Sequence, residues 1–294
     1  MAKLTLTVTA DQSGRTVHSL LKRELGLSTG CINRLKRTER GLTLNGTRVF
    51  TNVQVSSGDE LCADLDSAER TTALAPIPME LDIVFEDEHL LVLNKPAPLA
   101  VIPSSLVPDE PTLANALAHY LGDRFTFHPV NRLDRGTTGL MIVAKSGHVH
   151  DRLQRMLHSG DFLRRYLAIC EGCPQPANGS IHSPIGRTPG SAIKRQIDPD
   201  GQSAHSDYTT RKKSVRFSLV ELTPYTGRTH QLRVHMASIG CPLAGDWLYG
   251  TENRDLIARP ALHAAYLAVT HPITGEHLTF TAPMPADMIR LMEL

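Results

Sequence analysis

A single aspartate stands between two arginines in the stretch NRLDRGTTG, residues 131–139. These nine residues contain no Ser, Cys or His that could serve as a nucleophile. Asp134 could therefore cap an ordinary charged turn through its side chain, or it could be the ionised carboxylate of a reactive site. The second interpretation requires a cationic partner, because an opposite charge keeps a carboxylate ionised inside a pocket.

A second basic and polar cluster, YTGRTHQLR at residues 225–233, could supply this partner. If Arg228 reached Asp134, the carboxylate would stay charged and could act as a nucleophile or as a base. Sequence spacing leaves the alternative open, in which Arg228 is a surface residue and Asp134 belongs to a turn.

Other catalytic and metal-binding motifs are missing. The chain has no G-x-S-x-G, no P-loop, no G-x-G-x-x-G and no H-E-x-x-H. The CEGC stretch at 170–173 has the spacing of half a zinc site, but no second cysteine pair completes it, which favours a structural turn. His230 and His235 are five residues apart and do not share a helical face. We predict no metal and no cofactor.

Basic residues concentrate near the N-terminus, although the whole chain of 294 residues has a net charge of only +1. Residues 15–48 contain eight basic residues against two acidic ones, a net charge of +6. This asymmetry is typical of a phosphate-binding surface, while a solvated helix face would explain the charge equally well. We assign Lys36 and Arg37 to this phosphate-binding surface.

The elements around this basic segment indicate a small α/β module. Alternating residues predict a strand at 3–10, and apolar residues at helical spacing predict two short basic helices after it. Asn45-Gly46 between two β-prone runs predicts a tight hairpin. We expect an N-terminal domain over 1–70 and a linker over 71–79, which contains small residues and two prolines.

The elements that must position Asp134 and Arg228 come after residue 80. The stretch that contains Asp134 leads directly into an apolar strand at 139–146, and Arg228 lies at the start of an expected helix over 226–240 that Gly240 and Pro242 end. Further strands are expected at 81–95, as a pair joined by an acidic turn, and at 164–172, 214–224 and 277–283. Further helices are expected at 111–123 and 150–162. His263 and His271 are expected to lie in separate turns. Strands outnumber helices, so residues 80–294 are predicted to be α+β with a mixed, largely antiparallel sheet.

Cysteine usage and hydropathy indicate the compartment. Five cysteines are an odd number for a disulfide framework, which favours reduced thiols. The N-terminal segment lacks the apolar core of a signal peptide, and no run is long enough to cross a bilayer. We expect a soluble, monomeric, cytoplasmic protein.

Taken together, the motifs resemble those of one family. VNRLDRGTTGLMIVAKS resembles the HRLD-x-x-TSG-L signature of the RluA-type pseudouridine synthases, and LTPYTGRTHQLRVHMASIGCPLAGDWLYG resembles their TGRTHQIR signature with its G-D-x-x-YG tail. VLNKPAPLAVIP, RRYLAICEG and ALHAAYLAVTHPITGE are similar to three more family segments, in the family's order, over residues 80–285. The basic module resembles the small RNA-binding domain of ribosomal protein S-four.

The resemblance implies roles for individual residues. Asp134 would be the catalytic aspartate, Arg228 would pair with it, and Tyr166 would stack on the target uracil. Arg132 would help to replace the extruded nucleotide or grip the RNA backbone. A uridine in structured RNA must be swung out of its stack before its glycosidic bond can be reached.

The implied reaction is the isomerisation of uridine to pseudouridine without a metal or cofactor. Ribosomal RNA is the expected partner, with transfer RNA as the alternative. A non-catalytic RNA-binding or ribosome-assembly protein on the same scaffold is the competing hypothesis.

The chain departs from the family pattern at four positions. Asn131 replaces the usual His, Thr138 replaces Ser, Pro98 replaces Gly, and Arg165 replaces Lys. None of these changes removes an implied catalytic residue. Those at 98 and 131 could alter the shape of their loops and hence the choice of RNA.

Overall fold

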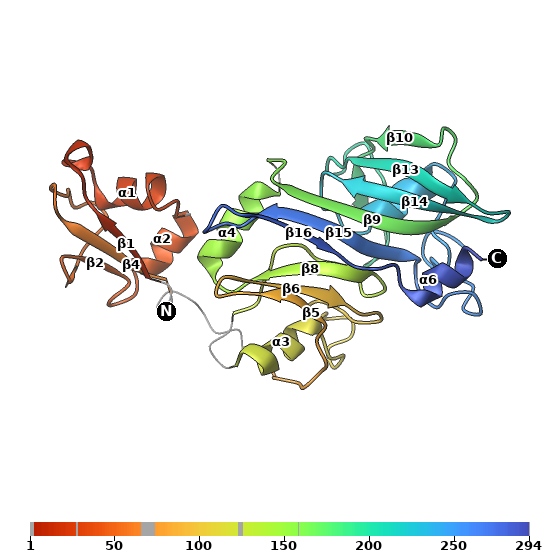
Figure 1. Ribbon diagram of the computed structural model, residues 1–294, viewed down its shortest axis with the longest axis horizontal. Helices are drawn as coiled ribbons and strands as arrows, with labels where there is room; N and C mark the ends of the chain where they lie inside the picture. Colours follow the sequence, from red (N-terminus) through yellow and green to blue (C-terminus); the bar gives the residue numbers. More distant parts are fainter. Residues whose placement is uncertain (1–2, 28, 66–73, 123–125, 158, 294) are drawn as a thin grey trace.

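The computed structural model describes residues 3–27, 29–65, 74–122, 126–157 and 159–293. They form a small N-terminal unit and a larger unit that contains a long sheet (Figure 1). Positions 71–73 of the expected linker lie outside the described residues. Within the described ranges, no helix has the length and apolar character that a membrane span requires.

The small unit packs helices against a four-stranded antiparallel sheet of order β1-β4-β2-β3. Its elements are β1 Lys3–Thr7, a 3-10 turn Ala10–Gln12, α1 Val17–Arg23, α2 Thr29–Leu35, β2 Leu42–Leu44, β3 Thr47–Arg48 and β4 Glu60–Asp64. The hairpin prediction is confirmed: Asn45 and Gly46 have φ values of 52° and 78° between β2 and β3. Two successive positive φ values match the twist of the flanking strands.

The larger unit is built on a ten-stranded sheet, in which eight strands follow the order β10-β13-β14-β9-β15-β8-β6-β5 and the other two, β16 and β7, pair with β15 and β8; β11 and β12 form a separate two-stranded sheet. Its strands are β5 Ile83–Glu86, β6 Leu90–Lys95, β7 His128–Pro129, β8 Thr138–Ala144, β9 Phe162–Glu171, β10 Asn178–Ile181, β11 Ile185–Arg187, β12 Arg195–Ile197, β13 Ser206–Lys213, β14 Phe217–Pro224, β15 Leu262–Thr270 and β16 His277–Thr281. Its helices are α3 Leu113–Leu121, α4 Gly147–Met156, α5 Gln231–Ser238 and α6 Ala286–Leu291.

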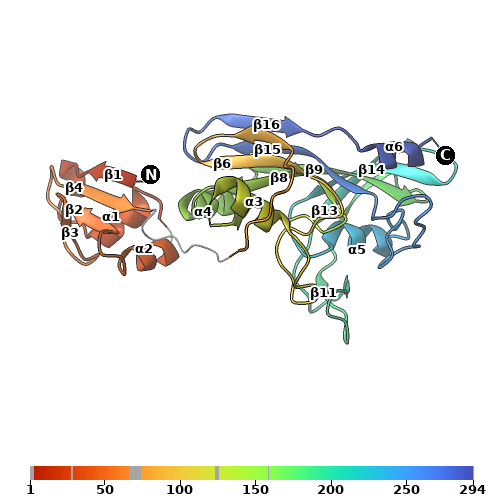
Figure 2. The same ribbon diagram turned by 90° about the horizontal axis from the view of Figure 1, so that it is seen from below.

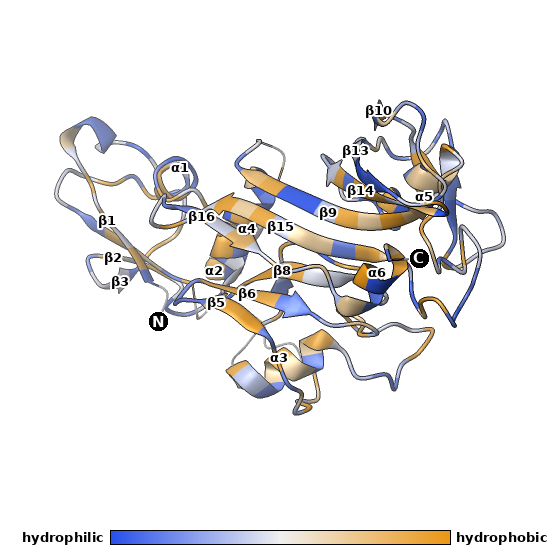
Figure 3. Cartoon of the chain, turned by 45° about the vertical axis from the view of Figure 1, so that its right-hand side comes forward, coloured by the Kyte–Doolittle hydropathy of each residue, from blue (hydrophilic) through white to orange (hydrophobic). Residues whose placement is uncertain are grey.

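The predicted fold class is confirmed, because the sheet is mixed and largely antiparallel. β8 and β15 are its parallel pair, and the other ladders within it are antiparallel. Alternate residues of the central strands enter different hydrophobic clusters. Leu91 and Met141 pack in a cluster with residues of α3 and α5, whereas Leu90 and Ile142 pack in a cluster with residues of α4. Figure 2 shows these helices along the sheet, and Figure 3 shows hydrophobic residues along β5, β9 and β15.

The expectation for His263 and His271 is wrong, because the segment between them is strand β15. His263 lies on this strand, and His271 follows its last residue. β15 joins β9 on one edge to β8 and β16 on the other. Its LHAAYLAVT sequence is largely buried and rich in alanine, so it lacks the polar alternation and the β-propensity that reveal a half-exposed strand.

Candidate active site

Asp134 lies in the loop that joins β7 to β8. Its carbonyl accepts a hydrogen bond from the backbone N–H of Thr137 at 3.0 Å, which closes a turn, and the neighbouring Leu133 side chain is buried in the core. The carboxylate itself is 29% exposed. It lines a cavity of about 80 Å³ together with Tyr166, His230 and other residues of this region. The turn thus presents the carboxylate to a small pocket.

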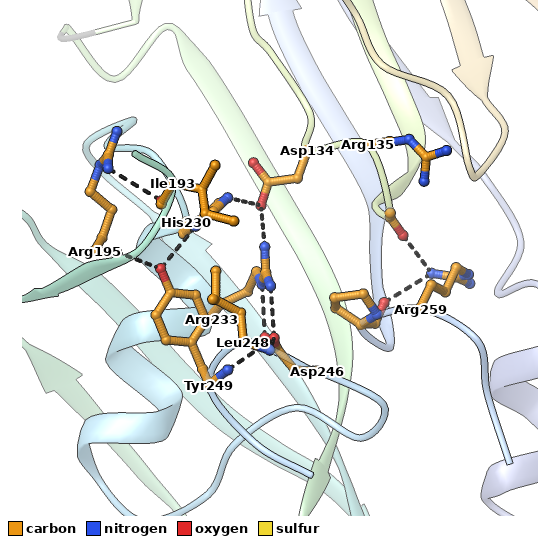
Figure 4. A network of polar contacts seen from close by, with 12 residues as sticks. Asp134, Arg135, Ile193, Arg195, His230, Arg233, Asp246, Leu248, Tyr249 and Arg259 are labelled. Carbon is orange, nitrogen blue, oxygen red and sulfur yellow. Dashed lines mark hydrogen bonds and ion pairs between the residues drawn. The ribbon is translucent and has the colours of Figure 1, made fainter. Parts of the chain in front are cut away.

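Arg233 is the arginine that approaches Asp134. Its Nη1 lies 3.4 Å from Oδ2 of Asp134, while Nε and Nη2 each donate to a carboxylate oxygen of Asp246 at 2.7 Å (Figure 4). The side chain of Asp246 is fully buried, and that of Arg233 is 5% exposed. This bidentate pair fixes the guanidinium, so one N–H is directed at Asp134.

The expected pairing of Arg228 with Asp134 is wrong. α5 begins at Gln231 rather than at residue 226, and the Gln231 side chain accepts hydrogen bonds from Thr226 Oγ1 and from the backbone N–H of Arg228. Arg228 therefore lies in the turn before the helix, where its Nε donates to the carbonyl of Ser203 at 2.9 Å. It still lines the same cavity. Arg233 belongs to the same sequence motif as Arg228. It lies three residues before the core residue Met236, and this helical spacing could have indicated that Arg233 faces the protein interior.

His230 is a further partner of Asp134 that the sequence analysis missed. Its Nε2 lies 3.9 Å from Oδ2 of Asp134, and its Nδ1 lies 2.8 Å from the hydroxyl of Tyr249. That hydroxyl accepts from the backbone N–H of Arg195 at 2.9 Å, and its own hydrogen can be donated to Nδ1 of His230. Nε2 of His230 faces the carboxylate.

The backbone and the pKa of His230 support a specific role in this site. It caps α5 with a φ of 58°, a left-handed conformation that is rare for a residue other than glycine and that clusters at functional sites. Burial lowers the pKa of His230, although the charge of Asp134 opposes this effect. The G-D-x-x-YG tail of the family motif supplies both supports of the site: Asp246 binds Arg233, and Tyr249 contacts His230. The sequence analysis assigned no role to these two residues.

Tyr166 reaches the pocket from β9 and is 7% exposed. Burial raises the pKa of its phenol, and the Asp134 charge adds to this, whereas Arg164 and a hydrogen bond with Asn131 lower it; the phenol is neutral at pH 7. Asn131 is buried, and its Oδ1 accepts from the backbone N–H of Ile142 at 2.9 Å. It therefore ties Tyr166 to β8, which gives the unusual residue at 131 a structural purpose.

The remaining predicted site residues fall into two groups. Arg132 is exposed and lines both the small cavity and an adjoining cavity of about 700 Å³. Lys36 and Arg37 are exposed just after α2 in the small unit, and neither cavity includes them. The structure thus brings Asp134, Tyr166, Arg132 and Arg228 together and leaves the two N-terminal residues apart.

A buried lysine supports the loop of Asp134 from below. Lys95 is fully buried, and its Nζ donates to the carbonyls of Pro96 and Leu99 at 2.8 Å and lies 3.4 Å from that of Arg135. Burial lowers the pKa of Lys95 to about 7, although the Asp134 charge raises it. One ammonium group thus connects the segment after β6 to the residue that follows Asp134.

We predict that Lys95→Met lowers the free energy of unfolding by about 1–3 kcal/mol, because buried carbonyls lose their donor. Urea unfolding measures this difference, and Lys212→Met, at an exposed position of β13, is the control. A loss no larger than that of the control would contradict the assigned role.

The same lysine predicts a pH dependence. The folded pKa is about 7 and the ordinary value is 10.5, so the unfolded chain binds more protons between these values. The contribution of Lys95 to the free energy of unfolding should then increase as pH rises from 7 to about 10. Unfolding at several pH values should show the wild type gaining on Lys95→Met over this range, and a constant difference would contradict the shift.

Comparison with known proteins gives a consistent result. The family model for RNA pseudouridylate synthase matches residues 89–238. An RNA pseudouridine synthase of Bacillus subtilis, YjbO, is 39% identical over 272 residues, which cover 92% of this chain and 96% of the relative. The ribosomal large subunit pseudouridine synthase D of Vibrio parahaemolyticus is 39% identical over 258 residues, which cover 82% of this chain and 78% of the relative.

A solved structure agrees with these sequence matches. Human RNA pseudouridylate synthase domain containing 1 superimposes with a TM-score of 0.57 at 28% identity, over 69% of this chain and 83% of the human chain. The superposition covers most of the human protein, so the similarity extends well beyond a local motif.

Proposed function

Since this chain belongs to the RNA pseudouridylate synthase family and is an RNA pseudouridine synthase, we propose that it modifies uridine in large-subunit ribosomal RNA, with Asp134 as its nucleophile. The relatives from Vibrio parahaemolyticus and Escherichia coli named for the ribosomal large subunit support the choice of RNA. We expect the enzyme to act in the cytoplasm as a monomer.

The observation that carries the role of Asp134 is that its carboxylate contacts the fixed guanidinium of Arg233 and lines the same small pocket as Tyr166. A partly exposed carboxylate in a small pocket can reach a ligand, and the adjacent cation keeps the carboxylate ionised. Tyr166 offers a neutral aromatic ring on which a flipped base can stack.

The two cavities suggest how RNA is placed. They share Arg132, Asp134, Arg164 and Arg228 among their lining residues, so the small pocket adjoins the large cavity. The extruded uracil would enter the small pocket, and its neighbouring phosphates would remain beside the arginines. Arg228 then contributes a charge to the RNA groove in place of its expected contact with Asp134.

The reaction is an isomerisation. The bond between sugar C1′ and uracil N1 breaks, a bond between C1′ and C5 forms, C5 loses a proton and N1 gains one. The carboxylate of Asp134 could attack the sugar, attack the base, or abstract a sugar proton on a glycal route. Each route needs a charged carboxylate beside the target nucleotide, and Arg233 and His230 hold it there.

Tritium release tests the proposed activity and substrate. RNA labelled at C5 of uridine loses tritium when pseudouridine forms, so we expect release from large-subunit ribosomal RNA. Release from transfer RNA alone would replace this substrate with the alternative. Tight binding of ribosomal RNA with no release from either RNA would favour the non-catalytic, ribosome-assembly interpretation.

We propose that the small unit, residues 1–70, is an RNA anchor separate from the catalytic domain at 80–294. Its net charge of +6 over residues 15–48 and the exposure of Lys36 and Arg37 support this role. Cations on such a surface bind phosphates without reading sequence.

We predict that reversing both charges, with Lys36→Glu and Arg37→Glu, weakens RNA binding and leaves kcat unchanged at saturating RNA. The logarithm of affinity should also fall less steeply with salt, by about 0.7–0.9 for each phosphate that the variant no longer neutralises. Filter binding over a salt series measures both effects. Lys212→Glu with Lys213→Glu, an exposed pair on β13, is the matched control, and equal affinities for the two double variants would contradict the anchor.

A further inference from the structure

Three aromatic rings stack beside the large cavity. The ring of Tyr225 lies 4.3 Å from that of His205, at an interplanar angle of 16°, and His205 lies 3.9 Å from His182, at 21°. Tyr225 follows the last residue of β14 and is 48% exposed. His205 covers one face of the ring, and about half of the tyrosine surface remains exposed.

Asp207 holds this stack in place. Its carboxylate accepts hydrogen bonds from Tyr225 Oη at 2.8 Å and from Ser180 Oγ at 2.5 Å, and it pairs with Nε2 of His205 at 3.2 Å. These contacts fix both the plane and the rotation of the tyrosine ring. A ring ordered in advance loses little conformational entropy when a ligand stacks on it.

Tyr225 borders the proposed RNA groove. Tyr225 lines the cavity of about 700 Å³ that also contains Asp134 and the guanidinium-bearing residues Arg164 and Arg228. The other end of the stack, His182, is not among its lining residues, so the tyrosine end is the one directed at this groove.

We propose that Tyr225 stacks on the base next to the flipped uridine and favours a purine at that position; this rests on the proposed function. Extruding a nucleotide deprives its neighbours of a stacking partner, and an aromatic ring at the edge of the groove can replace it. A purine presents a larger face to the ring than a pyrimidine does. The contact would therefore contribute to the choice of target.

Binding of a fluorescent RNA tests this contact. The probe is an RNA stem-loop with one uridine in its loop and 2-aminopurine on either side of this uridine. It is bound to full-length protein that carries Asp134→Asn, so that the uridine is not converted to pseudouridine during the measurement. Stacking on Tyr225 should quench the 2-aminopurine at one of the two positions. Adding Tyr225→Ala should abolish this quenching and weaken binding by about 5- to 100-fold.

Two controls separate stacking from structural support. Tyr225→Phe keeps the ring and loses the bond to Asp207, so it should retain the quenching and most of the affinity. An abasic site at the quenched position should weaken binding by protein with Tyr225 and have no further effect on Tyr225→Ala. Thermal unfolding confirms that each variant is folded.

Equal quenching by the Tyr225 and Tyr225→Ala proteins would overturn the proposal, as would a Tyr225→Phe variant that behaves like Tyr225→Ala. A probe with pyrimidines on both sides that binds as tightly as the purine probe would overturn the preference. The binding measurement is independent of catalysis. If wild-type protein forms no pseudouridine but the quenching depends on Tyr225, the proposed function fails and the contact remains.

Discussion

Replacing Asp134 with Asn is expected to abolish pseudouridine formation while leaving the fold and RNA binding intact. The amide preserves the shape of the side chain but removes the charge and the nucleophile. Loss of a catalytic nucleophile reduces turnover by about 10⁴- to 10⁶-fold. Tritium release from C5-labelled ribosomal RNA measures the loss, and Asp255→Asn, at an exposed position outside both cavities, is the matched control.

The stability of this variant is part of the same prediction. Arg233 retains its bidentate pair with Asp246, and the contact from Arg233 to the partly exposed Asp134 is the longer one. The change in unfolding free energy should therefore stay below about 1 kcal/mol. Tritium release at the wild-type rate would refute Asp134 as the nucleophile.

Replacing Arg233 with Met is expected to impair both folding and catalysis. Asp246 would become a fully buried carboxylate without its cation, and breaking a buried pair in this way costs about 3–5 kcal/mol. Asp134 would also lose the guanidinium that holds its charge. Urea unfolding should show the first effect, and tritium release at a temperature where the variant is folded should show the second.

Arg228→Met is the natural control, because the same motif contains both arginines. Arg228 contacts the carbonyl of Ser203 and is only partly buried, so its loss should change the unfolding free energy by about 0.5 kcal/mol or less. Arg233→Lys adds a second comparison, since it keeps a positive charge but loses the bidentate geometry. If Arg228→Met were the more destabilising of the two Met variants, the assignment of Arg233 as the structural arginine would be wrong.

Local elements of this protein could be predicted where a short segment determines its own conformation. Asn45-Gly46 forms the expected hairpin, since these two residues accept positive φ values. The paired strands β5 and β6 and the helix α3 were also found, because their apolar residues repeat with a regular period. β15 was missed, because a strand covered by neighbours on both edges and largely buried carries no such period.

The amino-acid sequence by itself determined the residue types of the site: one aspartate in a turn without another nucleophile, a tyrosine in a strand, and a motif with two arginines. Tertiary structure alone decided which arginine meets the aspartate. Gln231 accepts the hydrogen bonds of the preceding turn, so the helix begins late and carries Arg233 to Asp134 and Asp246. Helix periodicity follows from near neighbours, whereas an ion pair across 99 residues depends on how β8, β9 and α5 pack.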